Sequence, residues 1–79
     1  IQFNLFPNPA EDFLTINFTT NNTQSSEVIV SDISGREVFR DEVYSVAKVQ
    51  DFYTLNTSGF KPGFYSISFG GLSRKFVVK

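Results

Sequence analysis

The chain has 79 residues, with 7 basic and 8 acidic side chains, and it contains no Cys, His, Met or Trp. This composition excludes disulfide bonds, thiolate metal sites and histidine catalysis, and the length allows one small core rather than two domains. With 41% hydrophobic residues, including 10 Phe and 3 Tyr, the chain is expected to be globular, with most aromatic rings in the core.

The first third of the sequence predicts two strands joined by a proline-rich connection. Residues 2–6 form a short expected strand, and residues 13–18 alternate apolar with polar side chains, as in a half-buried strand. Pro7, Asn8 and Pro9 lie between them, and neither proline has a backbone N–H to donate. We therefore expect a rigid extended connection or turn with a structural role.

The middle third predicts a polar loop and a hairpin. Residues 21–26 are polar and are expected to form the loop, whereas residues 27–31 and 37–43 are expected to pair as antiparallel strands. Asp32 and Gly35 suit the first and fourth positions of a type I turn between these strands.

The segment after this hairpin is ambiguous. Residues 41–51 have apolar side chains at helical spacing, but the segment is short and rich in β-branched valine. It is expected to be a loop or irregular strand in which one helical turn can form, and residues 49–55 return to strand-like alternation.

The last third predicts a turn followed by a β-hairpin. Pro62 and Gly63 suit the second and third positions of a type II turn, which requires positive φ at the glycine. Residues 64–69 and 73–79 are expected to be its strands, joined at Gly70 and Gly71.

Six or seven short strands with closely spaced turns predict an all-β fold, a small antiparallel β-sandwich of immunoglobulin-like type, as one domain over residues 1–79. Tyr65 resembles a tyrosine corner, in which the hydroxyl bonds to backbone a few residues upstream. Because the first residue is Ile1 rather than Met, we expect the chain to be a piece of a longer protein.

Charge is distributed unevenly along the chain. Residues 1–56 carry all eight acidic side chains and three basic ones, whereas residues 57–79 carry four basic side chains and no acidic one. Four basic residues are too few for a nucleic-acid surface, and no apolar run is long enough for a membrane span. We expect neither a nucleic-acid partner nor a membrane span.

The acidic side chains form no recognisable catalytic or metal-binding pattern. Glu11 is adjacent to Asp12, and Asp41 to Glu42, but neighbouring residues in a strand point to opposite faces. No spacing matches a calcium loop. We therefore expect no enzyme activity, no metal and no cofactor.

Three motifs in one order connect the chain to a known family. Residues 5–10 (LFPNPA) precede residues 13–16 (FLTI), residues 32–38 (DISGREV) follow, and residues 58–67 (SGFKPGFYSI) come before the terminal residues 75–79 (KFVVK). Together they resemble the C-terminal sorting domain of the type IX (Por) secretion system of Gram-negative bacteria, over essentially the whole chain. Two departures, Phe6 for a frequent Tyr and Phe60 for a frequent Leu, keep the apolar character.

The resemblance implies a sorting signal rather than an enzyme. In that family an N-terminal cargo domain in the same polypeptide passes through the periplasm and then reaches the cell surface or is secreted. The implied partners are the type IX outer-membrane translocon, its shuttle protein and a sortase that commonly removes the domain. The cut is expected near Ile1. The alternative is an immunoglobulin- or fibronectin-like binding or accessory module, for a glycan or for the cargo, that is retained in the mature protein.

Within such a domain we expect the last strand to be recognised. Arg74, Lys75 and Lys79 are expected to form one exposed basic face, and a terminal strand can also offer an unpaired edge for strand addition. The alternative is a strand packed in its own sheet, with lysines preventing aggregation at its edge. The expected recognition residues are Arg74, Lys75, Phe76, Val77, Val78 and Lys79.

A second group of residues is expected to maintain the fold rather than contact a partner. Arg36, beside the type I turn, is left with two candidate acceptors, a partner's carboxylate or a neighbour of Glu37. The expected structural residues are Pro7, Asn8, Pro9, Asp32, Gly35, Arg36, Gly59, Pro62, Gly63 and Tyr65.

Overall fold

Seven strands build the part of the chain that the structure describes. The structure is a computed structural model that describes residues 2–79, so Ile1 and the cleavage point expected near it lie outside the described residues. The strands are β1 (Gln2–Phe6), β2 (Phe13–Thr19), β3 (Gln24–Asp32), β4 (Glu37–Ser45), β5 (Asp51–Asn56), β6 (Gly63–Phe69) and β7 (Leu72–Val78).

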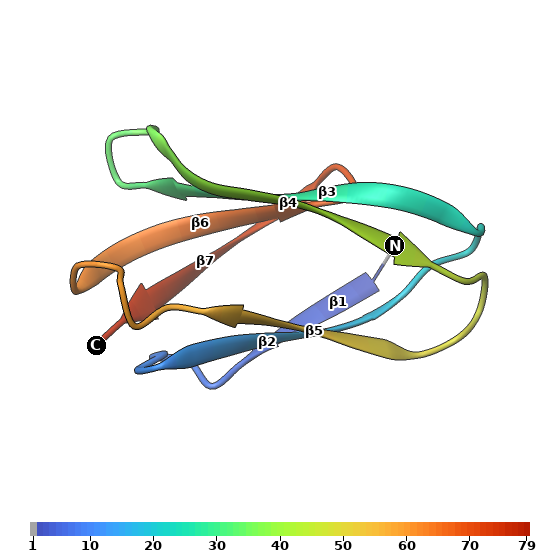
Figure 1. Ribbon diagram of the computed structural model, residues 1–79, viewed down its shortest axis with the longest axis horizontal. Helices are drawn as coiled ribbons and strands as arrows, with labels where there is room; N and C mark the ends of the chain where they lie inside the picture. The colour runs from blue at the N-terminus through green and yellow to red at the C-terminus, as the bar shows by residue number, and fades with distance from the viewer. Residues whose placement is uncertain (1) are drawn as a thin grey trace.

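The strands form two sheets that face each other (Figure 1). One sheet has the order β1-β2-β5 and the other β4-β3-β6-β7, and every pair of neighbouring strands is antiparallel. The predicted all-β antiparallel sandwich is confirmed. Edge strands β1 and β7 lie on one side of the sandwich.

Alternation along each strand places the core between the sheets. Leu14, Ile16 and Phe18 of β2 are buried, as their spacing predicted. The ring of Phe69 from β6 meets Phe18 and Phe3 of the opposite sheet edge-on, with centroids 5.0 and 5.8 Å apart. Edge-on aromatic pairs of this kind stabilise a core beyond the area that they bury.

The predicted polar loop is shorter than expected because β3 begins at Gln24 rather than Glu27. Ser26 and Ser45 are both buried, and β3 pairs with β4 over this polar stretch. Ser45 Oγ donates to the carbonyl of Gln24 at 3.2 Å, and Gln24 Nε2 donates to Ser26 Oγ at 2.9 Å. Hydrogen bonding within the sheet therefore compensates for the burial of these hydroxyls.

The segment after β4 contains no helical turn. β4 continues to Ser45 and β5 starts at Asp51, so the alternation of the strands overrides the weak helical spacing. Lys48 in the connecting loop has φ of 62°, which is incompatible with an α-helix. Its N–H donates to the carbonyl of Thr20 at 2.7 Å and ties this loop to the end of β2.

The aromatic residues divide between the core and the surface, so the expectation that most of them are buried is only partly correct. Five are buried, and three more, Phe39, Tyr53 and Phe60, pack partly buried against the core. Five rings are exposed: Phe6, Phe13, Tyr44, Phe52 and Phe64.

Candidate recognition surface

All three sequence motifs lie at one end of the sandwich. Successive strands run in opposite directions, so the loops after β1, β3 and β5 (residues 7–12, 33–36 and 57–62) emerge at the same end. β7 also finishes there, whereas β1 starts at the opposite end (Figure 1). We call the three loops together with the last residues of β7 the motif end.

The first motif is bonded directly to the last strand. The N–H of Ala10 donates to the carbonyl of Val77 at 2.7 Å, and the N–H of Lys79 donates to the carbonyl of Ala10 at 2.8 Å. Asn8 Oδ1 accepts a hydrogen bond from the N–H of Val77 at 3.0 Å. Asn8 is thus the member of the Pro-Asn-Pro motif whose side chain contacts β7, and Pro7 and Pro9 flank it, each after a cis peptide bond.

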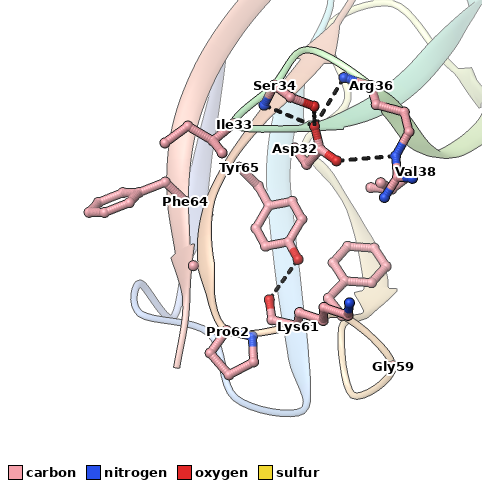
Figure 2. A pocket seen from close by; sticks show the side chains of 12 residues that line it. Asp32, Ile33, Ser34, Arg36, Val38, Gly59, Lys61, Pro62, Phe64 and Tyr65 are labelled. Atoms are coloured by element: carbon pink, nitrogen blue, oxygen red, sulfur yellow. Dashed lines mark hydrogen bonds and ion pairs between the residues drawn. The ribbon is translucent and has the colours of Figure 1, made fainter.

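The second motif forms the predicted type I turn. The N–H of Gly35 donates to the carbonyl of Asp32 at 2.9 Å, and Gly35 has φ of 89°. Asp32 Oδ1 accepts hydrogen bonds from Ser34 Oγ at 2.6 Å and from the N–H groups of Ser34 and Arg36, both at 3.0 Å (Figure 2). These donors, the Ser34 hydroxyl first, hold the pKa of Asp32 below its usual value.

Arg36 pairs within its own turn. Its Nε lies 3.2 Å from Asp32 Oδ2, so in this structure its acceptor is Asp32 rather than a neighbour of Glu37. The guanidinium is largely exposed and remains accessible to a partner.

The third motif contains the predicted tyrosine corner. The hydroxyl of Tyr65 donates to the carbonyl of Lys61 at 2.6 Å. The ring of Tyr65 lies between Phe60 and Phe76, with centroid distances of 5.3 and 5.6 Å. Tyr65 therefore fixes the loop of residues 57–62 onto the sheet that contains β7.

The predicted type II turn over residues 61–64 is wrong in detail. Gly63 does have positive φ, but the angle is 150°, far from the roughly +80° of that turn type. Gly63 already pairs with Val78 as the first residue of β6, and the Lys61 carbonyl accepts from Tyr65 instead. Gly59 is not at a positive φ, so its backbone does not require glycine.

The second and third motifs face each other across a shallow pocket of about 480 Å³. Residues 32–36 form one side and residues 59–65 the other (Figure 2). Two large apolar side chains stand exposed beside it, Ile33 with 83% and Phe64 with 61% of its surface accessible. Motifs far apart in sequence thus combine into one surface with both apolar and charged groups.

A comparison with known protein families shows the family to which this chain belongs. Residues 4–79 match the family described as the secretion system C-terminal sorting domain. The chain belongs to this family of type IX sorting domains. No curated protein matches the chain closely enough to count as a relative.

The sorting domain does not present its predicted recognition residues on one face. Phe76 and Val78 are in the core, with 1% and 3% of their surface accessible, so they cannot contact a partner while the domain stays folded. Lys75 and Lys79 are exposed, and Val77 is partly buried beside them.

The expected single basic face is therefore only partly correct, because Lys75 and Lys79 share one face of β7 and Arg74 does not. Side chains alternate along β7, which puts Arg74 on the side of Phe76 and Lys75 on the other. The Arg74 guanidinium lies 5.2 Å from the ring centre of Phe3, while Lys79 Nζ lies 3.5 Å from Glu11 Oε1. Only Arg74 was assigned to the wrong side, because it is an odd number of residues from both lysines and side chains alternate in a strand.

Thr57 is a structural residue of the sorting domain that the sequence interpretation missed. It is fully buried, its N–H donates to the carbonyl of Asp12 at 2.9 Å and its hydroxyl to the carbonyl of Glu11 at 3.2 Å. The only signal in the sequence was its position directly after Asn56, because Asn favours turns. In the structure, Asn56 Oδ1 accepts hydrogen bonds from the N–H and the hydroxyl of Ser58. Thr57 joins the first and third motif loops.

Within residues 2–79, no three acidic side chains lie close enough together to hold a metal ion. No helix of the described chain has the length and apolarity needed to cross a membrane. The family is one of sorting signals rather than of enzymes.

Proposed function

We propose that this sorting domain directs a cargo protein, located before it in the same polypeptide, through the type IX outer-membrane translocon. The motif end and the accessible residues of β7 are the surface that the translocon and its shuttle protein contact. The convergence of the three motifs at one end is the observation that carries the proposal. Because β1 starts at the other end, a cargo joined there leaves the motif end uncovered.

The arrangement of β1 also supports removal by a sortase after transit through the periplasm. The strands of the described chain begin at Gln2, so a cut before β1 breaks no strand and leaves the core intact. The cargo is then free to be attached to the surface or released.

Export of a reporter tests the proposal. The 79 residues are fused to the C-terminus of a reporter protein in a strain with an active type IX system, and surface exposure is measured by labelling intact cells. We expect the reporter at the surface or in the medium. A reporter that stays in the periplasm, while another cargo of the same strain is exported, contradicts the proposed function.

Point substitutions locate the contact surface better than a deletion, because removing β7 would take Phe76 and Val78 out of the core. Ile33→Asp and Phe64→Asp change exposed side chains at the motif end and are expected to reduce export strongly. Val46→Asp is the matched control, since Val46 is also exposed but lies in the loop between β4 and β5 at the opposite end. Equal losses for all three variants would contradict recognition at the motif end.

One observation favours the alternative of a retained binding module. The outer face of β1, β2 and β5 exposes Phe6, Phe13 and Phe52 among Asn and Thr side chains, without a charged residue between them. Aromatic rings beside neutral amides and hydroxyls suit a neutral glycan. The intact mass of the secreted parent protein separates the two functions: loss of the segment supports sorting, and retention supports binding.

A further inference from the structure

The outer edge of β7 is covered only near its C-terminal end. β7 is the last strand of its sheet, and its other side pairs with β6. Asn8 and Ala10 cover the edge by bonding to the N–H and carbonyl of Val77 and to the N–H of Lys79. These bonds reach no residue of β7 before Val77, so the part of the edge that precedes Val77 is uncovered.

Two residues in the uncovered part of the edge have outward backbone groups. The N–H and carbonyl of Val77 point away from β6, and the direction of these groups repeats every second residue in an antiparallel strand. Ser73 and Lys75 therefore direct their N–H and carbonyl groups outward as well. Within residues 2–79, no strand or side chain pairs with these four groups.

A groove runs along this open edge. It has a volume of about 540 Å³ and lies between β7 and β1, with Asn4 and Leu5 on the β1 side and Asn8 closing it toward the motif end. An exposed strand edge of this kind is the surface to which an extended peptide adds as a further strand.

Charge indicates which peptide fits. Arg36, Arg40 and Lys79 each lie within ion-pair distance of a carboxylate. Arg74 and Lys75, which line the groove, have no carboxylate partner among residues 2–79. A second copy of the domain pairing through the same edge would bring these cations against their own counterparts, which opposes self-association.

We propose that the open edge of β7 over residues 73–75 binds an extended acidic peptide by strand addition. The peptide backbone bonds to the outward N–H and carbonyl groups of Ser73 and Lys75, and its acidic side chains lie beside Lys75 on the outer face and Arg74 in the groove. The inference rests on the proposed function in one respect only, that the peptide is a segment of the secretion machinery.

Nuclear magnetic resonance on the 15N-labelled 79-residue chain tests the edge directly. In the free domain, the amides of Ser73 and Lys75 are expected to exchange with solvent much faster than those of Arg74 and Phe76, which face β6. A capped eight-residue peptide with the repeat Thr-Glu-Glu-Thr, which places glutamates on both faces of an added strand, is expected to shift and protect the Ser73 and Lys75 amides. The matched peptide with lysine in place of glutamate is expected to bind several-fold more weakly.

Two substitutions at one position separate the backbone from the charge. Lys75→Pro removes an outward N–H and keeps the hydrogen bonds between β7 and β6, since proline is tolerated at strand edges. It is expected to abolish binding, whereas Lys75→Gln keeps the N–H and is expected only to weaken it. If the spectrum shows that Lys75→Pro does not fold, two measurements still test the edge site. These are the amide exchange rates of the wild-type domain and the peptide binding of Lys75→Gln.

The outcomes distinguish this inference from the proposed function. A wild-type domain that exports its reporter but shows slow exchange at Ser73 and Lys75, or no protection by the acidic peptide, overturns the edge inference alone. Equal binding of both peptides overturns the acidic preference. A domain that binds the acidic peptide at this edge but does not export its reporter supports the edge site and contradicts the proposed function.

Discussion

The hydroxyl of Tyr53 donates a hydrogen bond of 2.7 Å to Asp41 Oδ2 and so joins β5 of one sheet to β4 of the other. β4 and β5 are the edge strands opposite the groove between β1 and β7. The bond lowers the pKa of Asp41, and burial together with this bond raises the pKa of Tyr53. The pair therefore closes one side of the sandwich in a way that depends on pH.

Tyr53→Phe is predicted to change the pH dependence of stability at both extremes. The native pKa of Asp41 is below its unfolded value, so its contribution is present above that unfolded value and is lost as the pH falls. The native pKa of Tyr53 is above its unfolded value, so its contribution is present below about pH 10 and is lost as the pH rises. Urea unfolding measured from acidic to alkaline pH should show a smaller loss of stability at both ends of the pH range in Tyr53→Phe than in the wild type.

The control for this prediction is Tyr44→Phe, because the Tyr44 ring is exposed and forms no hydrogen bond among the described residues. Some acid sensitivity should remain in Tyr53→Phe, since the pKa of Asp32 is lowered by the Ser34 hydroxyl and that of Glu37 by Arg40. An unchanged profile in Tyr53→Phe would show that the bond between the two sheets does not contribute to stability.

Phe76→Ala is predicted to destabilise the domain by about 3–5 kcal/mol, the usual cost of deleting a buried phenyl ring. Phe64→Ala, one strand away but largely exposed, should change stability by less than about 0.5 kcal/mol. Urea denaturation measures both. Similar losses for the two variants would mean that β7 does not pack as described.

Tyr65→Phe keeps the aromatic stack with Phe60 and Phe76 but removes the donor to the Lys61 carbonyl. The loss of this single hydrogen bond is expected to cost about 0.5–1.5 kcal/mol. Hydrogen exchange should accelerate mainly in residues 57–62, the loop that the bond anchors. Uniform acceleration across the domain would indicate a role beyond this loop.

Gly35→Ala is predicted to cost about 1 kcal/mol, because Gly35 has a positive φ that an alanine rarely adopts. An added Cβ would meet no atom within 4 Å, so the effect comes from the backbone alone. Gly59→Ala is the matched control, since the space around it is equally open and its φ is not positive. Thermal unfolding should show a lower midpoint for Gly35→Ala and little change for Gly59→Ala.

Local patterns in the sequence were sufficient for most strands and turns. The alternation of Leu14, Ile16 and Phe18 and the tyrosine corner at Tyr65 depend on neighbours only a few positions away, and both were predicted. β3 and β4 extend over the polar residues Ser26 and Ser45 because each hydroxyl finds a hydrogen-bond partner in the paired strands. Residue type alone does not reveal such a partner.

The surface was harder to predict because its contacts connect distant parts of the chain. Ala10 bonds to Val77 and Thr57 to Asp12, and nothing in either local segment indicates its partner. The assignment of recognition to the last strand did not separate the buried Phe76 and Val78 from the accessible Lys75.

The bonds between Ala10 and the last strand make the surface at the motif end dependent on the whole length of the chain. Until Val77 and Lys79 have been synthesised and placed, residues 8–10 lack the partners that hold them in position. A polypeptide that is truncated before them, or whose sheets fail to close, cannot assemble this surface. A partner that binds this surface therefore binds only domains in which β7 is present and bonded to residues 8–10.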